Sequence, residues 1–267
     1  MGRTAWKELA RREDRPARIA AAKAKIEARA KERYAREQAE HDAKMKARAQ
    51  KAKTTGRKPG GRPPQPPSAA PGPKDQVNLT DPDSRILPIA GGGFEQAYNA
   101  QATVATGSLL VVATDVAQAA NDKQQIAPAL DKLAALPEAL GAPEALLADS
   151  GYFSAANVNA CAEAKIAPLI APGRERHHRS WQDRFAAAPP APSDPTPLEA
   201  MRHRLATPEG RQAYALRKQT PEPVFGIIKS VIGFRQFSLR GLDQVKGEWN
   251  LVTLAWNLKR MFALTPA

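Results

Sequence analysis

A stretch rich in glycine and proline divides this chain into two regions with different folding properties. Its residues include the run Gly56-Arg-Lys-Pro-Gly-Gly-Arg-Pro-Pro64, and further prolines follow. Proline lacks the amide hydrogen that a helix needs, and such a composition cannot form a core. We therefore predict a Pro/Gly-rich basic linker over residues 56–77. It separates an N-terminal region, residues 1–55, from a C-terminal domain, residues 78–267.

The N-terminal region is rich in alanine, lysine, arginine, glutamate and glutamine, which are good helix formers, and Pro16 is its one interruption. Apart from alanine, it has too few apolar residues for a stripe that would face a core. We predict a long, charged helical arm, either one helix or a helical hairpin. Its basic charge would suit contact with DNA, and a solvent-exposed spacer would give the same pattern.

The net charge of the chain favours a polyanionic partner. Lysine and arginine number 40 against 27 aspartates and glutamates, which gives a formal net charge of +13 at pH 7. Nucleic acid is the commonest partner of so basic a chain, although a ribosome-associated protein would also fit. The single Cys161 excludes an intramolecular disulfide and a cysteine-based zinc site. No apolar run approaches the roughly 20 residues of a membrane span. We expect a cytoplasmic, nucleoid-associated protein.

Strand and helix patterns alternate in the first half of the C-terminal domain. Alternating and continuous apolar runs predict a β-hairpin, after which helices alternate with short buried strands. The predicted strands are residues 97–106, 109–116, 145–148 and 167–171, and the predicted helices are residues 121–136 and 154–164. This order argues for an α/β domain with parallel strands in its sheet.

The second half of the domain is mainly helical. A basic, proline-rich section of about residues 172–197 predicts an insertion loop, and helical patterns follow over residues 197–218 and 222–231. Residues 242–264 predict a terminal helix packed on the domain through Val245, Trp249, Val252, Leu254, Trp256, Leu258 and Met261. The spacing of its tryptophans indicates core positions rather than base-stacking positions.

Two acidic residues stand out as candidates for chemistry. Asp149 directly follows a predicted strand, and the carboxyl ends of strands form the functional edge of open α/β sheets. Glu222 lies in a basic segment with Lys229 roughly two helical turns away on the same side. A carboxylate that binds metal, flanked by cations that bind phosphate, would suit phosphodiester chemistry. The alternatives are a turn aspartate and a solvated amphipathic helix.

Several motifs taken together resemble the DDE transposases of bacterial insertion sequences, which carry a Tyr-Arg-Glu-Lys signature. The central pieces are Leu-Leu-Ala-Asp149-Ser-Gly-Tyr-Phe-Ser and Tyr214-x-x-Arg217-Lys218-x-x-x-Glu222-Pro-Val-Phe-Gly-x-x-Lys229. The flanking pieces are Thr80-Asp-Pro-Asp-Ser-Arg85, Gly93-Phe-Glu-Gln-Ala-Tyr-Asn-Ala-Gln101, Asn121-Asp-Lys-Gln-Gln125 and Arg240-Gly-Leu-x-x-Val-x-Gly-Glu-Trp249. The resemblance covers residues 78–264, and the basic arm resembles a helical insertion of some members.

The resemblance implies a ribonuclease H-like fold, a mixed sheet flanked by helices. It makes Asp149 and Glu222 catalytic acids that bind Mg²⁺ or Mn²⁺ in a two-metal site. Tyr214, Arg217, Lys218 and Lys229 would contact DNA near the transposon end. The implied partner is duplex DNA with terminal inverted repeats, and the resemblance leaves room for a homo-oligomer.

One element of the family pattern is missing from this sequence. The first catalytic aspartate of the family lies on the first strand of the sheet, in an Asp-Gly-Thr type motif, and no such strand precedes the predicted hairpin. Asp81 and Asp83 lie in a proline-rich turn, Asp115 ends a strand, and Asp122 fits a helix cap. We therefore expect an N-terminally truncated transposase, impaired in cleavage and strand transfer. The alternative is a non-catalytic DNA-binding protein or regulator of transposition.

Overall fold

The computed structural model describes residues 3–57, 60–89, 92–173 and 190–265, with residues 3–11 described through their backbone alone. The chain divides into two compact units, residues 1–84 and residues 85–267. Most of the predicted insertion loop, residues 174–189, lies outside the described residues.

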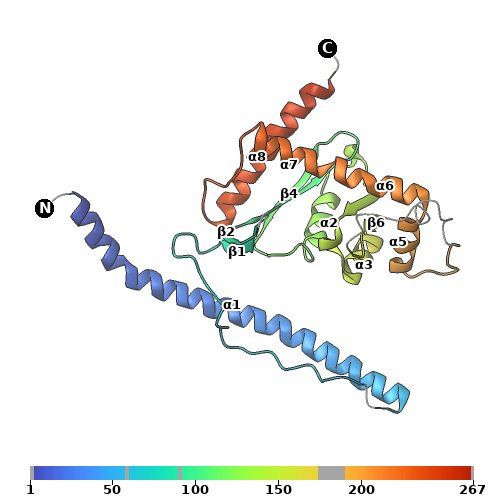
Figure 1. Cartoon of the computed structure of the whole chain (residues 1–267), viewed down its shortest axis with the longest axis horizontal. Coiled ribbons are helices and arrows are strands. Elements are labelled where there is room, and N and C mark those ends of the chain that lie inside the picture. Colours follow the sequence, from blue (N-terminus) through green and yellow to red (C-terminus); the bar gives the residue numbers. More distant parts are fainter. Residues whose placement is uncertain (1–2, 58–59, 90–91, 174–189, 266–267) are drawn as a thin grey trace. The chain divides into compact units, whose positions relative to one another are not determined.

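The first unit is one long helix with an extended segment along it (Figure 1). Helix α1 spans Arg3–Thr55 and continues through Pro16. Residues 60–84 return beside the helix, where Arg33 pairs with Asp75 at 2.8 Å and Lys25 pairs with Asp83 at 2.7 Å. Ala30 is only 1% exposed. The composition of the Pro/Gly-rich segment did not predict this packing, because it depends on contacts between residues far apart in sequence.

The second unit contains three pairs of strands. The first two pairs are antiparallel, and the third is parallel, as strand–helix alternation predicts. The pairs are β1 (Arg85–Pro88) with β2 (Phe94–Ala97), β3 (Asn99–Val104) with β4 (Val111–Ala117), and β5 (Ala145–Ala148) with β6 (Ala167–Ile170). The pair β1–β2 was not predicted.

The strand pairs are not joined into one sheet. The described residues form three two-stranded sheets, so the expectation of a single mixed sheet is wrong for this structure. The physical reason is that no described strand bridges β3–β4 and β5–β6 through hydrogen bonds. A two-stranded sheet is marginal alone, and the flanking helices must therefore supply most of the packing.

The helices follow the predicted pattern, with two differences in their bounds. They are α2 (Ile126–Ala134), α3 (Ala155–Glu163), α5 (Pro197–Ala206), α6 (Pro208–Gln219), α7 (Pro221–Ser230) and α8 (Leu242–Leu264), with short 3₁₀ turns η1 (Glu138–Leu140) and η2 (Ser150–Tyr152). The predicted helix 121–136 begins only at Ile126. The predicted helix 197–218 is broken at Thr207, which caps α6 before a proline at its first position.

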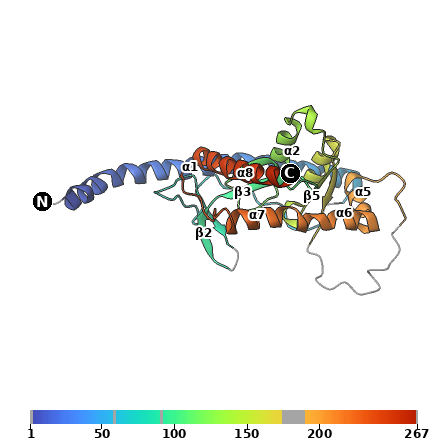
Figure 2. The same ribbon diagram turned by 90° about the horizontal axis from the view of Figure 1, so that it is seen from above.

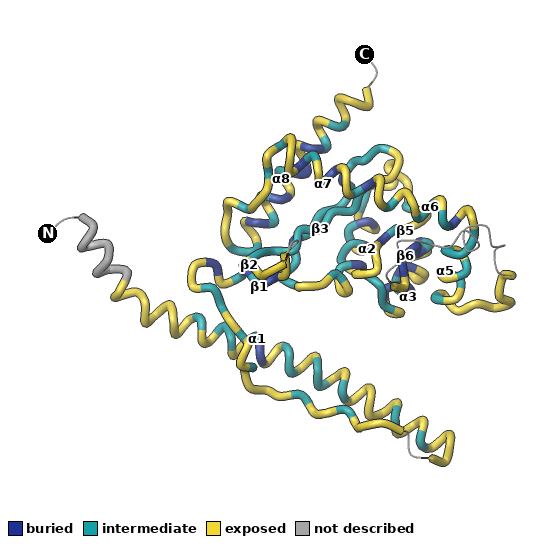
Figure 3. Tube along the Cα trace, viewed as in Figure 1, coloured by how far each residue is buried: buried dark blue, intermediate teal, exposed yellow. Residues whose placement is uncertain are grey.

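Two hydrophobic clusters form the core of the second unit (Figure 3). One gathers α2, α3, α5, β5 and β6, and the other packs α7 and α8 on β3–β4. Trp249 and Trp256 are 2% and 4% exposed, which confirms that they are core residues. Leu254, Leu258 and Met261 are exposed, so the prediction that these three residues pack on the domain is wrong. The helix still contacts the β3–β4 hairpin beyond Trp256, where Arg260 Nε donates to the Ser108 carbonyl at 2.7 Å.

Strand β4 lies in contact with α8 and with α2. Helices α6 and α7 follow one another along nearly one line, with Thr220 between them (Figure 2). None of the described helices is both long enough and apolar enough to cross a membrane.

Candidate active site around Asp149

Asp149 lies directly after β5, at the carboxyl end of a parallel strand, as the sequence predicts. Its side chain is exposed, and its Oδ1 accepts a hydrogen bond from the Gly151 amide at 2.8 Å. This bond caps the turn η2, so the turn aspartate considered in the sequence is also present. Capping occupies Oδ1, and Oδ2 accepts no hydrogen bond from the part of the chain that the structure describes.

A second carboxylate, that of Asp122, lies near Gly151. A Cβ atom at this glycine would lie 2.9 Å from Asp149 Oδ1 and 3.5 Å from Asp122 Oδ2. Asp122 and Asp149 are 27 positions apart in sequence, yet both approach the open side of one glycine. A side chain at residue 151 would crowd Asp149 Oδ1, whereas its distance to Asp122 Oδ2 would be an ordinary van der Waals contact.

Asp122 does not cap the following helix, and that prediction is wrong. The residue before α2 is Gln125, which makes no side-chain cap hydrogen bond. Asp122 Oδ1 instead accepts hydrogen bonds from Asn99 Nδ2 and Gln101 Nε2, each at 2.8 Å. These long-range partners on β3 hold the carboxylate in place, and its Oδ2 is the oxygen near Gly151.

Tyr152 closes this network from the other side. Its hydroxyl donates to Gln101 Oε1 at 2.5 Å. Burial raises the pKa of Tyr152, and the negative charges of Asp122 and Asp149 raise it further. The phenol therefore stays protonated at neutral pH and remains a donor, which keeps the Gln101 amide oriented towards Asp122.

A buried asparagine joins the two loops that carry these acids. Asn157 is 7% exposed, and its amide donates to the Lys123 carbonyl at 2.8 Å and to the Tyr152 carbonyl at 2.6 Å. Lys123 follows Asp122, and Tyr152 lies three residues beyond Asp149. One side chain thereby sets the spacing of the two acid-bearing segments.

Helix α6 brings Tyr214, with Arg217 against its ring, to the end of β5. The Tyr214 hydroxyl donates to the Ala148 carbonyl at 3.3 Å, one residue before Asp149. The Arg217 guanidinium carbon lies 5.6 Å from the Tyr214 ring centroid, within cation–π range. Arg217 Nε is buried and lacks a hydrogen-bond partner among the described residues. Such a donor is costly unless a ligand or solvent satisfies it.

Glu222 and Lys229 lie in the first and last turns of α7 and are exposed. Lys218, in the last turn of α6, is also exposed. The buried face of α7 is formed by Val224 and Ile228, so the charged residues project away from the core. Among the described residues, no three carboxylates, histidines or cysteines gather where they could hold a metal ion. The pairing of Glu222 with Asp149 stays a prediction.

Sequence reasoning missed the residues that surround Asp149. Asn99, Gln101 and Asp122 all lie in motifs that were singled out, but none was given a role in the site. The available signal was two amide side chains at alternate positions of one strand, which must lie on the same face of it. Their partner could not be identified without the tertiary structure.

Comparison with known proteins relates the last part of the chain to one family. Residues 192–262 match a family model described as a transposase DDE domain. The matched segment contains Tyr214, Glu222 and Lys229, whereas Asp122 and Asp149 precede it. Neither the curated proteins nor the solved structures compared with the chain gave a match.

Proposed function

Residues 192–262 match the model of a transposase DDE domain, and on this premise we propose that the chain is a catalytically impaired transposase that binds duplex DNA and acts in its cleavage and strand transfer. The DNA would carry the terminal inverted repeats of an insertion sequence. Asp149 and Glu222 are the proposed catalytic acids. Tyr214, Arg217, Lys218 and Lys229 are the proposed DNA contacts.

The hydrogen bond from Tyr214 to the Ala148 carbonyl is the observation that carries this proposal. It joins helix α6 to the strand end that bears Asp149, although Tyr214 and Ala148 are 66 positions apart in the sequence. The family match does not extend to Asp149. The contact therefore supports including this acid in the same site as the signature residues.

The side chains near Asp149 fit a divalent ion in part. DDE transposase domains generally use divalent metals, and Mg²⁺ is often held by one or two carboxylates together with substrate phosphates. Asp149 and Asp122 would supply such a pair, with Glu222 as the further acid of the proposal. When bound, Mg²⁺ or Mn²⁺ would activate a water or 3′-hydroxyl and stabilise the leaving oxygen.

The protein's own residues would perform the remaining tasks. Asn99 and Gln101 donate to one oxygen of Asp122, which fixes the orientation of its carboxylate. Arg217 has a buried Nε without a partner among the described residues, and a DNA phosphate would satisfy it. Lys218 and Lys229 are exposed cations that would bind neighbouring phosphates.

A nicking assay on duplex DNA with terminal inverted repeats tests the proposal. Because the first catalytic aspartate of the family pattern is missing, we expect only weak nicking with Mg²⁺ or Mn²⁺, and this nicking should be lost with EDTA and in the variants Asp149→Ala and Glu222→Ala. Glu163→Ala is the matched control, because Glu163 is an exposed acid at the end of α3, away from the signature motifs. Nicking that survives both catalytic substitutions would refute the assignment of these acids.

A non-catalytic role in DNA binding is the second candidate. The observation that favours it is the lack of a three-residue metal cluster among the described residues, since a two-metal site needs more ligands than two carboxylates. In that case Asp149→Ala would bind the terminal repeats with the same affinity as the wild type. The wild-type protein would not nick this DNA, whether or not metal is present. A regulator of transposition would have these properties.

A further inference from the structure

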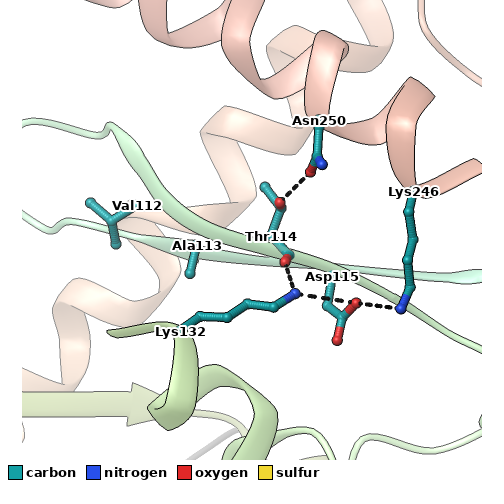
Figure 4. Close-up of a pocket in the computed structure, with 7 residues that line it drawn as sticks. All are labelled: Val112, Ala113, Thr114, Asp115, Lys132, Lys246 and Asn250. Carbon is teal, nitrogen blue, oxygen red and sulfur yellow. Dashed lines mark hydrogen bonds and ion pairs between the residues drawn. The ribbon is translucent and has the colours of Figure 1, made fainter. Parts of the chain in front are cut away.

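A pocket with two lysines opens on strand β4, between helices α2 and α8 (Figure 4). Its volume is about 280 Å³, and it is lined by Val112, Ala113, Thr114, Asp115, Lys132, Lys246 and Asn250. Lys132 comes from α2, and Lys246 and Asn250 come from α8. The floor is therefore a strand, and the cationic walls are contributed by two separate helices.

Two ammonium groups in the pocket share one carboxylate. Lys132 Nζ lies 3.3 Å from Asp115 Oδ1, and Lys246 Nζ lies 3.4 Å from the same oxygen. Burial alone would raise the pKa of Asp115, but the Val116 amide and both lysines lower it overall. The carboxylate therefore stays charged, and the three groups keep a net charge of +1.

The pocket has hydrogen-bond donors beyond those that Asp115 uses. An ammonium has three donors. Lys132 directs its donors to Asp115 and the Thr114 carbonyl, and Lys246 contacts Asp115 alone among the described residues. Asn250 accepts from the Thr114 hydroxyl through Oδ1 at 2.5 Å, which leaves its amide hydrogens available. Both lysine side chains are about two-fifths exposed, at 41% and 42%, so a ligand from solvent can reach them.

The pocket is a neighbour of the acid pair at Asp149. In the β3–β4 register, Asp115 lies directly opposite Gln101, whose amide donates to Asp122. Side chains of directly opposed residues start about 4.5–5.5 Å apart, on the same face. A polymer of phosphates that reaches Asp149 would therefore pass close to Lys132 and Lys246.

We propose that Lys132, Lys246 and Asn250 form a binding site for a phosphate group, and that its natural ligand is a phosphodiester of the DNA strand. The net positive charge, the unused donors and the open pocket are the properties that phosphate recognition needs. The identification of the ligand as DNA rests on the proposed function. The inference that the pocket binds a phosphate group rests on the pocket alone. Asp115 holds the two ammonium groups together in the absence of ligand and competes with the phosphate.

Two substitutions separate a phosphate site from a purely structural ion pair. Lys246→Gln should weaken binding of duplex DNA about five-fold, and it should lower the slope of log affinity against log salt by about one. Asp115→Asn should tighten binding, because it removes the competing charge and leaves both lysines. If the cluster were only structural, both changes would lower the unfolding temperature, and neither would strengthen DNA binding.

The experiment measures fluorescence anisotropy of labelled duplex DNA over a salt series. Lys259→Gln is the control, because it removes an exposed lysine of the same helix that does not line the pocket. Thermal unfolding of each variant shows whether it is folded, and Lys132→Gln replaces Asp115→Asn if the latter does not fold. The proposal is overturned if Lys246→Gln matches Lys259→Gln, or if Asp115→Asn weakens binding.

A second arm titrates inorganic phosphate at constant ionic strength, observed by NMR at the Lys132 and Lys246 ammonium groups. If phosphate shifts the signals of both lysines and added DNA suppresses these shifts, the ligand is a DNA phosphodiester. If added DNA does not change the shifts, the ligand is a free phosphate. The absence of shifts together with unchanged DNA binding refutes the site. If the wild-type chain fails to bind DNA, the proposed function fails, and this arm still decides whether the pocket binds phosphate.

Discussion

The hydroxyl of Tyr214 donates a hydrogen bond to the carbonyl oxygen of Ala148 over 3.3 Å. This bond links α6 to the residue that precedes Asp149. A neutral hydrogen bond of this kind contributes only about 0.5–1.5 kcal/mol to folding stability. Its main effect is to hold α6 next to the end of β5. It brings Tyr214, which lies in the segment that matches the transposase DDE domain, to the strand end that bears the proposed catalytic acid Asp149.

Tyr214→Phe should therefore affect the site more than the stability of the fold. We expect the free energy of unfolding to fall by about 1 kcal/mol, because the ring packing is retained and only the hydrogen bond is lost. Nicking activity should fall further than this change in stability explains. Urea unfolding and a nicking time course check the two expectations, with Tyr34→Phe in α1 as the control. Equal activity in wild type and variant would show that the bond has no role in the site.

Gly151→Ala should displace the carboxylate of Asp149. The new Cβ would lie 2.9 Å from Asp149 Oδ1, closer than packed atoms allow, and the side chain must move away. Because the nearest atom belongs to a side chain, we expect little loss of stability but a clear loss of metal-dependent nicking. The matched control is Gly247→Ala in α8, where a Cβ would meet nothing within 4 Å. That change should stabilise the helix by roughly 1 kcal/mol and leave nicking intact.

Asn157→Ala should loosen the two loops that carry Asp122 and Asp149. The substitution removes both donors and leaves the partly buried carbonyls of Lys123 and Tyr152 without them. An unsatisfied buried group costs about 1–3 kcal/mol, so we expect a loss in that range by urea unfolding. Hydrogen exchange should also rise in residues 121–125 and 149–153. A loss below about 0.5 kcal/mol would mean that water replaces the asparagine amide.

Acid should release the extended segment of the first unit from α1. The Arg33 side-chain hydrogen bond, and after it the Gly72 amide, hold the pKa of Asp75 below its usual value. A carboxylate with a lowered pKa stabilises the folded state above its unfolded pKa, near 4, and the stabilisation is lost as pH falls through the lower folded value. Hydrogen exchange of residues 70–84 should therefore increase below about pH 4. In Arg33→Gln the hydrogen exchange of these residues should already be fast at neutral pH, and its rate should change less between neutral and acid pH than in the wild type.

The elements whose signals lie within a few neighbouring residues could be predicted well. The apolar run at residues 145–148 and the helix at residues 242–264 agree with β5 and α8 in the structure. Local patterns also identified Trp249 and Trp256 as core residues, because helical spacing alone places both on one side of α8. The same spacing could not show that Leu258 is exposed, since that depends on whether another element covers the end of the helix.

The sequence by itself determined that a long charged helix precedes an α/β region and that Asp149 follows a strand, and it placed Tyr214 and Glu222 in a segment that resembles a transposase signature. These properties follow from local composition, periodicity and motif spacing. Only the tertiary structure decided that Asp122 lies beside Asp149 and that Lys132 and Lys246 converge on Asp115. Each of these groupings joins elements separated along the chain, and the hydrogen bonds that create it exist only after the β3–β4 pair has packed between α2 and α8.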